Sequence, residues 1–184
     1  MSRAKWWVVF VIGLGSSPWA AERLSRTEAL ALAFPGATLE RREHFLTEEQ
    51  VAKVRALSGV EVRSKYVVAY EARSGQALSG VAFFDTHQVR TQPETAMVAI
   101  APTGFVIRVE VVQFGEPQEY AAPERWIGQL SGQALSPRLS LKADVKPLSG
   151  ASLTAQSLVD ASRRALALFA VLYPPNPEKV PGDP

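Results

Sequence analysis

The chain has 184 residues, 47% of them hydrophobic and 21% charged, a composition typical of one globular domain with a core of its own. Its formal net charge is +2, and the charges balance once Arg3 and Lys5 near the N-terminus are set aside, so nucleic acid is not expected as a partner. The absence of cysteine excludes disulfides, thiolate catalysis, cysteine-ligated zinc, iron–sulfur clusters and a lipid-modified N-terminal cysteine.

Residues 1–21 have the pattern of a secretory signal peptide. Arg3 and Lys5 give a basic start, residues 6–15 form a short apolar stretch, and small residues follow up to Ala21. The apolar stretch is shorter than the ~20 residues that a membrane-spanning helix requires. We expect a signal peptide or, alternatively, a short membrane anchor. Either one places the domain outside the cytosol, in the periplasm or at the outer face of the cytoplasmic membrane.

Two capping boxes predict two helices in the N-terminal third. Ser25 and Glu28 form the first box, and the apolar helix that follows extends to residue 34, where a Pro-Gly pair ends it. Thr47 and Gln50 form the second box, and its helix extends to about residue 57, where a Ser-Gly pair ends it.

The middle of the chain is predicted to be β-rich, with strands at residues 65–72, 77–86, 95–101 and 105–114, separated by turn residues. In the last strand Phe105, Ile107, Val109 and Val111 form the cleaner apolar set. This alternation fits an antiparallel sheet with one buried face.

The C-terminal third is predicted to hold a short helix at residues 123–130, a loop at 131–146 and a long amphipathic helix at about 154–172. Arg163 and Arg164 fall opposite its apolar stripe, which predicts a solvated face. Residues 173–184 form a proline-rich tail that we expect to be disordered. Strands clustered between helices predict an α+β fold: an antiparallel sheet flanked by helices in a single domain at residues 25–172.

The segment 147–157 contains the most informative pattern of the chain. Two hydroxyls, Ser152 and Thr154, follow a Gly-Ala pair just before the long helix. Small residues let a bulky ligand approach the backbone, and a helix N-terminus suits a phosphate. The ordinary role of such hydroxyls is helix capping.

The sequence Ser-Gly-Ala-Ser-Leu-Thr at residues 149–154 resembles the flavinylation motif of FMN-binding domains. These domains occur in the G subunit of Rnf electron-transport complexes, in the C subunit of the sodium-translocating NADH:quinone reductase and in small exported proteins. In that family a flavin transferase moves FMN from FAD onto a Ser or Thr hydroxyl, forming a phosphoester. The resemblance implies an exported electron carrier with FMN attached through Thr154 or Ser152. It assigns no catalytic residue.

The resemblance covers roughly residues 25–172. It includes residues 80–87, similar to the family's central hairpin, residues 106–120, similar to a strand and loop, and the helix after them. It implies cofactor contacts from the motif and from two other segments: Ser149, Gly150, Ala151, Ser152, Leu153, Thr154, His87, Glu116 and Tyr120. Membrane or periplasmic proteins would be the redox partners, and a flavin transferase would be the maturation partner.

Other interpretations remain open. Many family members carry an acid three residues before the motif, but this chain has Lys146 there and Asp144 as the nearest acid. The departure motivates the alternative of an exported binding or interaction module that carries no covalent flavin. A weaker alternative is a hydrolase that uses Ser152 or Ser149 with His87. With two histidines and no metal-binding spacing, no metal site is expected.

Overall fold

The computed structural model describes residues 23–174, so the predicted signal peptide and nearly all of the predicted tail lie outside the described residues. One antiparallel sheet has the strand order β1-β2-β3-β4-β5, each strand beside its neighbour in sequence. The strands are β1 (Thr38–Phe45), β2 (Tyr66–Ser74), β3 (Ala77–Gln88), β4 (Pro93–Ile100) and β5 (Val106–Phe114). The helical elements are α1 (Arg26–Ala33), α2 (Glu48–Ser58), η1 (Gln118–Tyr120), α3 (Glu124–Ile127), η2 (Gly128–Leu130) and α4 (Ser152–Leu172). The predicted α+β class, an antiparallel sheet flanked by helices, is confirmed.

Both capping boxes form as predicted. The Ser25 hydroxyl accepts from Glu28 N at 3.2 Å, and the Glu28 carboxylate accepts from Ser25 N at 2.8 Å. Thr47 and Gln50 make the same reciprocal pair at the start of α2. Each pair satisfies backbone N–H groups that the first turn of a helix leaves without partners.

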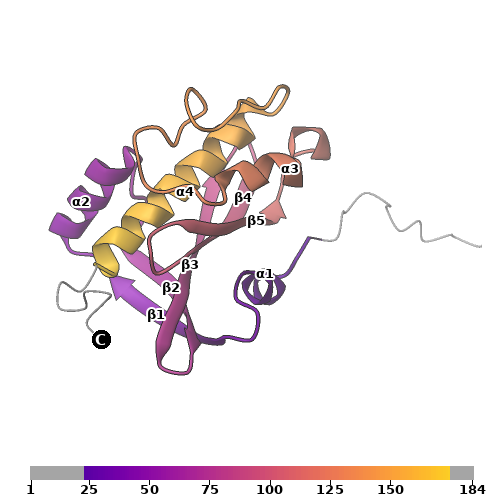
Figure 1. Cartoon of the computed structure of the whole chain (residues 1–184). Helices are drawn as coiled ribbons and strands as arrows, with labels where there is room; N and C mark the ends of the chain where they lie inside the picture. Colours follow the sequence, from indigo (N-terminus) through magenta and orange to yellow (C-terminus); the bar gives the residue numbers. More distant parts are fainter. Residues whose placement is uncertain (1–22, 175–184) are drawn as a thin grey trace, which may run out of the picture.

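Helices cover both faces of the sheet, which corrects the expectation of one buried face. Ala96 and Val98 of β4 belong to the core under α4, whereas Met97 and Ala99 belong to the core under α1. Figure 1 shows α4 crossing one side of the sheet and α1 lying on the other. Because β4 is buried on both faces, seven of its eight residues are buried, and residues 96–100 form a continuous apolar run.

Strand β1 is absent from the sequence-based prediction. It is an edge strand whose residues are all exposed or only half-buried. Its charged side chains pair locally and with β2, as in the contact between Arg42 and Glu71 at 3.8 Å. A strand that buries neither face lacks the apolar alternation that identifies strands in sequence.

A bulge in β5 corrects the predicted apolar face of that strand. Ile100 pairs with Val106, but the preceding Ala99 pairs with Arg108, so Ile107 is an extra residue. The shift buries Val106 at 2% exposure and leaves Phe105 47% and Ile107 36% exposed. One inserted residue switches the face on which all earlier side chains lie. The burial of Val109 and Val111 agrees with the prediction.

The predicted solvated face of α4 is wrong. Arg163 donates to the carbonyls of Ser58 at 2.6 Å, Ser136 at 2.8 Å and Leu139 at 3.0 Å. Arg164 is 6% exposed and lies against the sheet. Helix α2 and the loop at residues 131–146 cover the polar side of α4. Arg163 lies on that side and donates hydrogen bonds to their carbonyls.

Candidate functional site

The predicted motif forms the start of α4. Gly150 has a positive φ of 83°, a conformation that favours glycine, and it turns the chain into the helix. Ala151 is the N-cap and supplies no side-chain hydrogen bond, and the first turn contains no acidic residue. The alternative role of the motif hydroxyls, capping of this helix, is therefore not seen in the structure. Uncapped N–H groups at the positive end of a 21-residue helix favour an anion.

A pocket of about 190 Å³ opens at this helix start. Its lining residues are Arg90, Tyr120, Gly150, Ala151, Ser152, Leu153 and Thr154. The pocket is smaller than the roughly 300–1,000 Å³ of ordinary small-molecule sites. Its size suits a phosphate and part of a flexible chain, and a ring system attached to that chain would lie outside it.

The two motif hydroxyls have different environments. Ser152 is exposed, and its Oγ donates to the Leu148 carbonyl at 3.3 Å, a long hydrogen bond. Thr154 is 1% exposed, and its Oγ1 donates to the Tyr120 carbonyl at 2.6 Å. The Ser152 hydroxyl is accessible to another protein, whereas the Thr154 hydroxyl fastens α4 to the loop at Tyr120.

Arg90, a residue not predicted from the sequence, supplies a positive charge to the pocket. It lies in the turn between β3 and β4, and its guanidinium carbon is 4.4 Å from the centre of the Tyr120 ring. No local pattern marks it, because it comes sixty residues before the motif and reaches it only through the fold. A cation over an aromatic face gains electrostatic stabilisation and keeps its edge N–H groups available.

Glu116 does not line the pocket but binds the backbone of the turn that carries Arg90. One of its carboxylate oxygens accepts backbone N–H bonds from Thr91 at 2.6 Å, Gln92 at 2.8 Å and Arg90 at 3.1 Å. These bonds hold the pKa of Glu116 below its usual value, and the bond from Thr91 contributes most. Of the residues proposed outside the motif, Tyr120 lines the pocket and Glu116 fixes the turn that carries Arg90.

His87 lies elsewhere, in a buried cluster of charged side chains beneath α4. Its Nδ1 is 2.9 Å from Asp85 and its Nε2 is 2.8 Å from Glu94, while Arg164 pairs with the other oxygen of Asp85. Both ring nitrogens are occupied by carboxylates. His87 therefore contacts neither Ser149 nor Ser152, so the nucleophile and base of a hydrolase are not assembled, and neither ring nitrogen is open to a flavin.

The electrostatics of this cluster favour its charged form. Burial alone would lower the pKa of His87, but the hydrogen bonds and charges of Asp85 and Glu94 outweigh it and raise the pKa. Burial alone would raise the pKa of Asp85, but His87 and Arg164 outweigh it and hold the pKa low. The two shifts thus favour a protonated His87 beside an ionised Asp85, which also pairs with Arg164.

Within residues 23–174 no group of three or more His, Asp or Glu side chains is placed to hold a metal ion; Asp85 and Glu94 bind opposite edges of the His87 ring and do not converge on one point. None of the helices in this part of the chain is long and apolar enough to cross a membrane.

The chain was compared with known proteins. No protein-family description and no curated protein matches its sequence. Among solved structures it is similar to the crystal structure of Shewanella oneidensis NqrC, at 15% identity and a TM-score of 0.49. The alignment covers 64% of this chain and 64% of the NqrC chain, so the matched part is less than two thirds of that protein.

Proposed function

We propose that the protein is an exported electron carrier that holds FMN through a phosphoester at the start of α4. The observation that carries the proposal is an exposed serine hydroxyl, Ser152, at an uncapped helix N-terminus that shares a pocket with Arg90. The helix end and the arginine both favour a phosphate anion. The resemblance of residues 149–154 to a flavinylation motif names the same position on independent grounds.

Ser152 is the acceptor that the geometry favours over Thr154. A transferase must bring the phosphorus of its donor to the hydroxyl oxygen, which requires an accessible side chain. Ser152 is exposed and would give up a 3.3 Å hydrogen bond, whereas Thr154 is 1% exposed and would give up one of 2.6 Å. In the transfer, Ser152 Oγ bonds to the FMN phosphorus of FAD, the pyrophosphate P–O bond breaks, AMP leaves and the hydroxyl proton goes to solvent.

The described residues fit the phosphate end of FMN. Arg90 and the first-turn N–H groups of α4 would bind its oxygens, and Gly150 leaves the approach open because it has no side chain. Leu153, 51% exposed at the mouth of the pocket, would pack against the flavin ring. Bound FMN supplies one- and two-electron transfer, and a ring held at the surface suits exchange with membrane or periplasmic redox partners. The tether retains the cofactor at its site.

The test is the intact mass of the denatured protein after co-expression with a flavin transferase. We expect an added mass of one FMN less water, mapped to the peptide that contains Ser152. Ser152→Ala should remove the adduct. Thr154→Val keeps the side-chain shape and should retain it. Loss of the adduct in Thr154→Val with retention in Ser152→Ala would move the acceptor to Thr154, and retention in both variants would overturn the site.

An unmodified binding module remains the second candidate, because the charges before the motif differ from those of most FMN-binding domains. Lys146 has an exposed side chain, and Asp144 is already paired with Arg138 at 2.6 Å. A transferase that reads an acid here would meet a positive charge. An unmodified mass in a host that modifies a control domain, together with restored modification in Lys146→Glu, would show that this residue blocks attachment in the natural chain.

A further inference from the structure

The sheet is split between β2 and β3. Their pairing begins at the hairpin and ends at Ala69 and Phe83. Beyond that point β2 continues beside β1 as far as Tyr66, and β3 continues beside β4 as far as Gln88. The two strands therefore diverge, and within residues 23–174 no strand fills the gap between them.

At the edges of the split, side chains form hydrogen bonds with backbone groups that have no partner strand. The Ser64 hydroxyl accepts from the backbone N–H of Tyr66 and donates to the Tyr66 carbonyl, both at 3.0 Å. Arg63 donates to the Thr86 carbonyl of β3 at 3.3 Å. The Tyr66 N–H and carbonyl and the Thr86 carbonyl thus have partners without closure of the sheet at this point.

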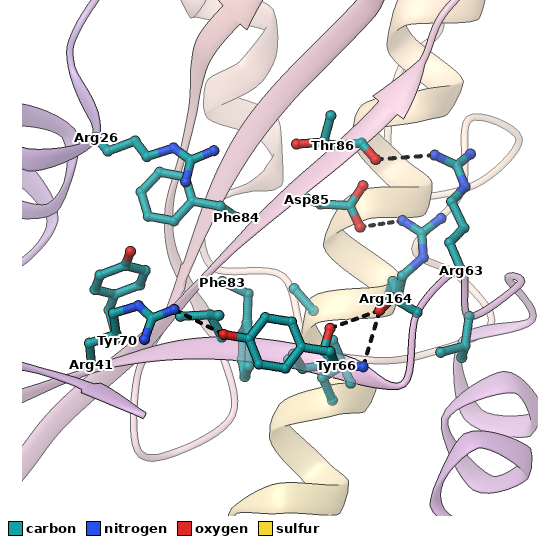
Figure 2. A pocket seen from close by; sticks show the side chains of 16 residues that line it. Arg26, Arg41, Arg63, Tyr66, Tyr70, Phe83, Phe84, Asp85, Thr86 and Arg164 are labelled. Carbon is teal, nitrogen blue, oxygen red and sulfur yellow. Dashed lines mark hydrogen bonds and ion pairs between the residues drawn. The ribbon is translucent and has the colours of Figure 1, made fainter. Parts of the chain in front are cut away.

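A pocket of about 360 Å³ occupies the split, within the size range of small-molecule sites. Figure 2 shows it from close by. Four of its lining residues are aromatic: Tyr66, Tyr70, Phe83 and Phe84. Aliphatic side chains from the preceding loop, β2 and α4 complete the apolar part of the wall: Val62, Val67, Val68, Ala165 and Leu168.

The charged lining is strongly positive. Four arginines face the pocket, Arg26, Arg41, Arg63 and Arg164, against the single carboxylate of Asp85. In Figure 2, Arg26 and Arg41 lie on one side of it and Arg63 and Arg164 on the other.

Two of these arginines already form ion pairs with carboxylates of the protein. Arg164 pairs with Asp85, and Arg41 pairs with Glu43 and donates to the Tyr66 hydroxyl at 3.0 Å.

The other two arginines have no carboxylate partner among the described residues. Arg26 lies with its guanidinium carbon 5.0 Å from the centre of the Phe84 ring, and Arg63 makes the hydrogen bond to Thr86. A guanidinium has five N–H donors, so each of these contacts leaves donors for a ligand. Both side chains are exposed at the rim and add a positive charge beside an aromatic wall.

We propose that this split-sheet pocket binds a small organic anion with a flat aromatic body, an aromatic carboxylate. The positive charges of Arg26 and Arg63, on opposite sides of the pocket, attract the carboxylate, and the ring packs against the aromatic side chains of the wall. The apolar wall distinguishes this ligand from inorganic phosphate, and the two arginines distinguish it from a neutral aromatic compound. The site shares no residue with the flavin pocket proposed above and does not depend on it.

Isothermal titration calorimetry of the full chain with 2-naphthoate tests the proposal. Naphthalene-2-methanol is the matched neutral probe, and inorganic phosphate is the anion without an apolar body. We expect 2-naphthoate to bind at least about tenfold more tightly than either, with an affinity that falls as salt is added, because both arginines are exposed.

Variants of the two free arginines locate the site. Arg26→Gln and Arg63→Gln should each weaken 2-naphthoate binding about threefold to tenfold, and the double variant more. Arg125→Gln, at an exposed arginine of α3, should leave the affinity unchanged. Equal melting temperatures would show that each variant is folded.

Three results would overturn the proposal: no binding of 2-naphthoate at millimolar concentration, equal binding of the neutral alcohol, or an unchanged affinity in the double variant. Ser152→Ala separates the two proposals. If that variant loses covalent flavin and still binds 2-naphthoate, the sites are independent, and failure of one leaves the other standing.

Discussion

At its first turn α4 presents an exposed serine and N–H groups that no side chain caps, whereas at its middle Arg164 is buried against Asp85 and the His87–Glu94 pair. The first arrangement leaves polar groups available to a ligand. The second satisfies most of its polar groups internally. Among the described residues Glu94 Oε1 is the only buried side-chain oxygen or nitrogen without a hydrogen-bond partner. The difference fits the ligand site that we propose at the helix start and predicts a structural role for the helix middle. Substitutions in the two regions should therefore separate stability from function.

The largest effect is expected at the helix middle. Arg164→Ala leaves Asp85 without its arginine next to a buried carboxylate–imidazole pair, and we expect the free energy of unfolding to fall by about 3–5 kcal/mol. Urea denaturation followed by circular dichroism measures it. Arg125→Ala removes an exposed arginine and should change the stability by less than about 0.5 kcal/mol. A loss below about 1 kcal/mol for Arg164→Ala would mean that the cluster is not a structural element.

His87 gives a second, pH-dependent test of the same cluster. His87→Gln replaces hydrogen bonds between a cation and two carboxylates with weaker neutral ones, and we expect a loss of about 2–3 kcal/mol at pH 6. Because the folded pKa of His87 is raised, its contribution is fully present below the unfolded value near 6.5 and disappears as the pH rises through the folded pKa.

The stability of the wild-type protein should therefore fall more steeply above neutral pH than that of His87→Gln. The groups that face the ring are Asp85 of β3 and Glu94 of β4, with Arg164 of α4 behind Asp85. Unfolding free energies measured at several pH values between 6 and 9 test this. Parallel pH profiles would show that His87 does not titrate in this range.

The sequence alone predicted those parts of the molecule whose signals are local. The capping boxes at Ser25 and Thr47 place α1 and α2, and the stripe of small and apolar residues places α4. The motif at residues 149–154 indicates a ligand position because glycine, small residues and hydroxyls are consecutive in the chain.

The parts that sequence missed depend on tertiary contacts. Arg90 reaches the pocket because Glu116 holds its turn, and the two residues are 26 positions apart. His87 reads as a strand-end histidine, and only strand pairing brings it opposite Glu94. The split between β2 and β3 has no sequence signal either, since each strand keeps a partner on its other side. All three features depend on contacts between segments that are distant in the sequence: the hydrogen bonds of Glu116 in the first, and strand pairing in the other two.

Thr154→Val tests the connection between the helix start and the loop at Tyr120. Valine keeps the shape of threonine but leaves the Tyr120 carbonyl without the donor that now lies at 2.6 Å. We expect the free energy of unfolding to fall by about 1–2 kcal/mol, since the group is buried. Attachment of flavin should persist. A stability equal to that of the wild-type protein would indicate that another donor, such as water, replaces the hydroxyl.

The smallest effect on stability is expected at the residue with the largest expected effect on function. Ser152→Ala removes an exposed hydroxyl whose only hydrogen bond in the described structure is 3.3 Å long, and it places alanine, a good helix former, in the first turn of α4. The unmodified variant should therefore match the unmodified wild-type protein within about 0.5 kcal/mol. Measuring both proteins without a flavin transferase removes any contribution from the cofactor. A clear loss of stability would mean that Ser152 supports the helix start, and any loss of flavin in this variant would then have a structural cause.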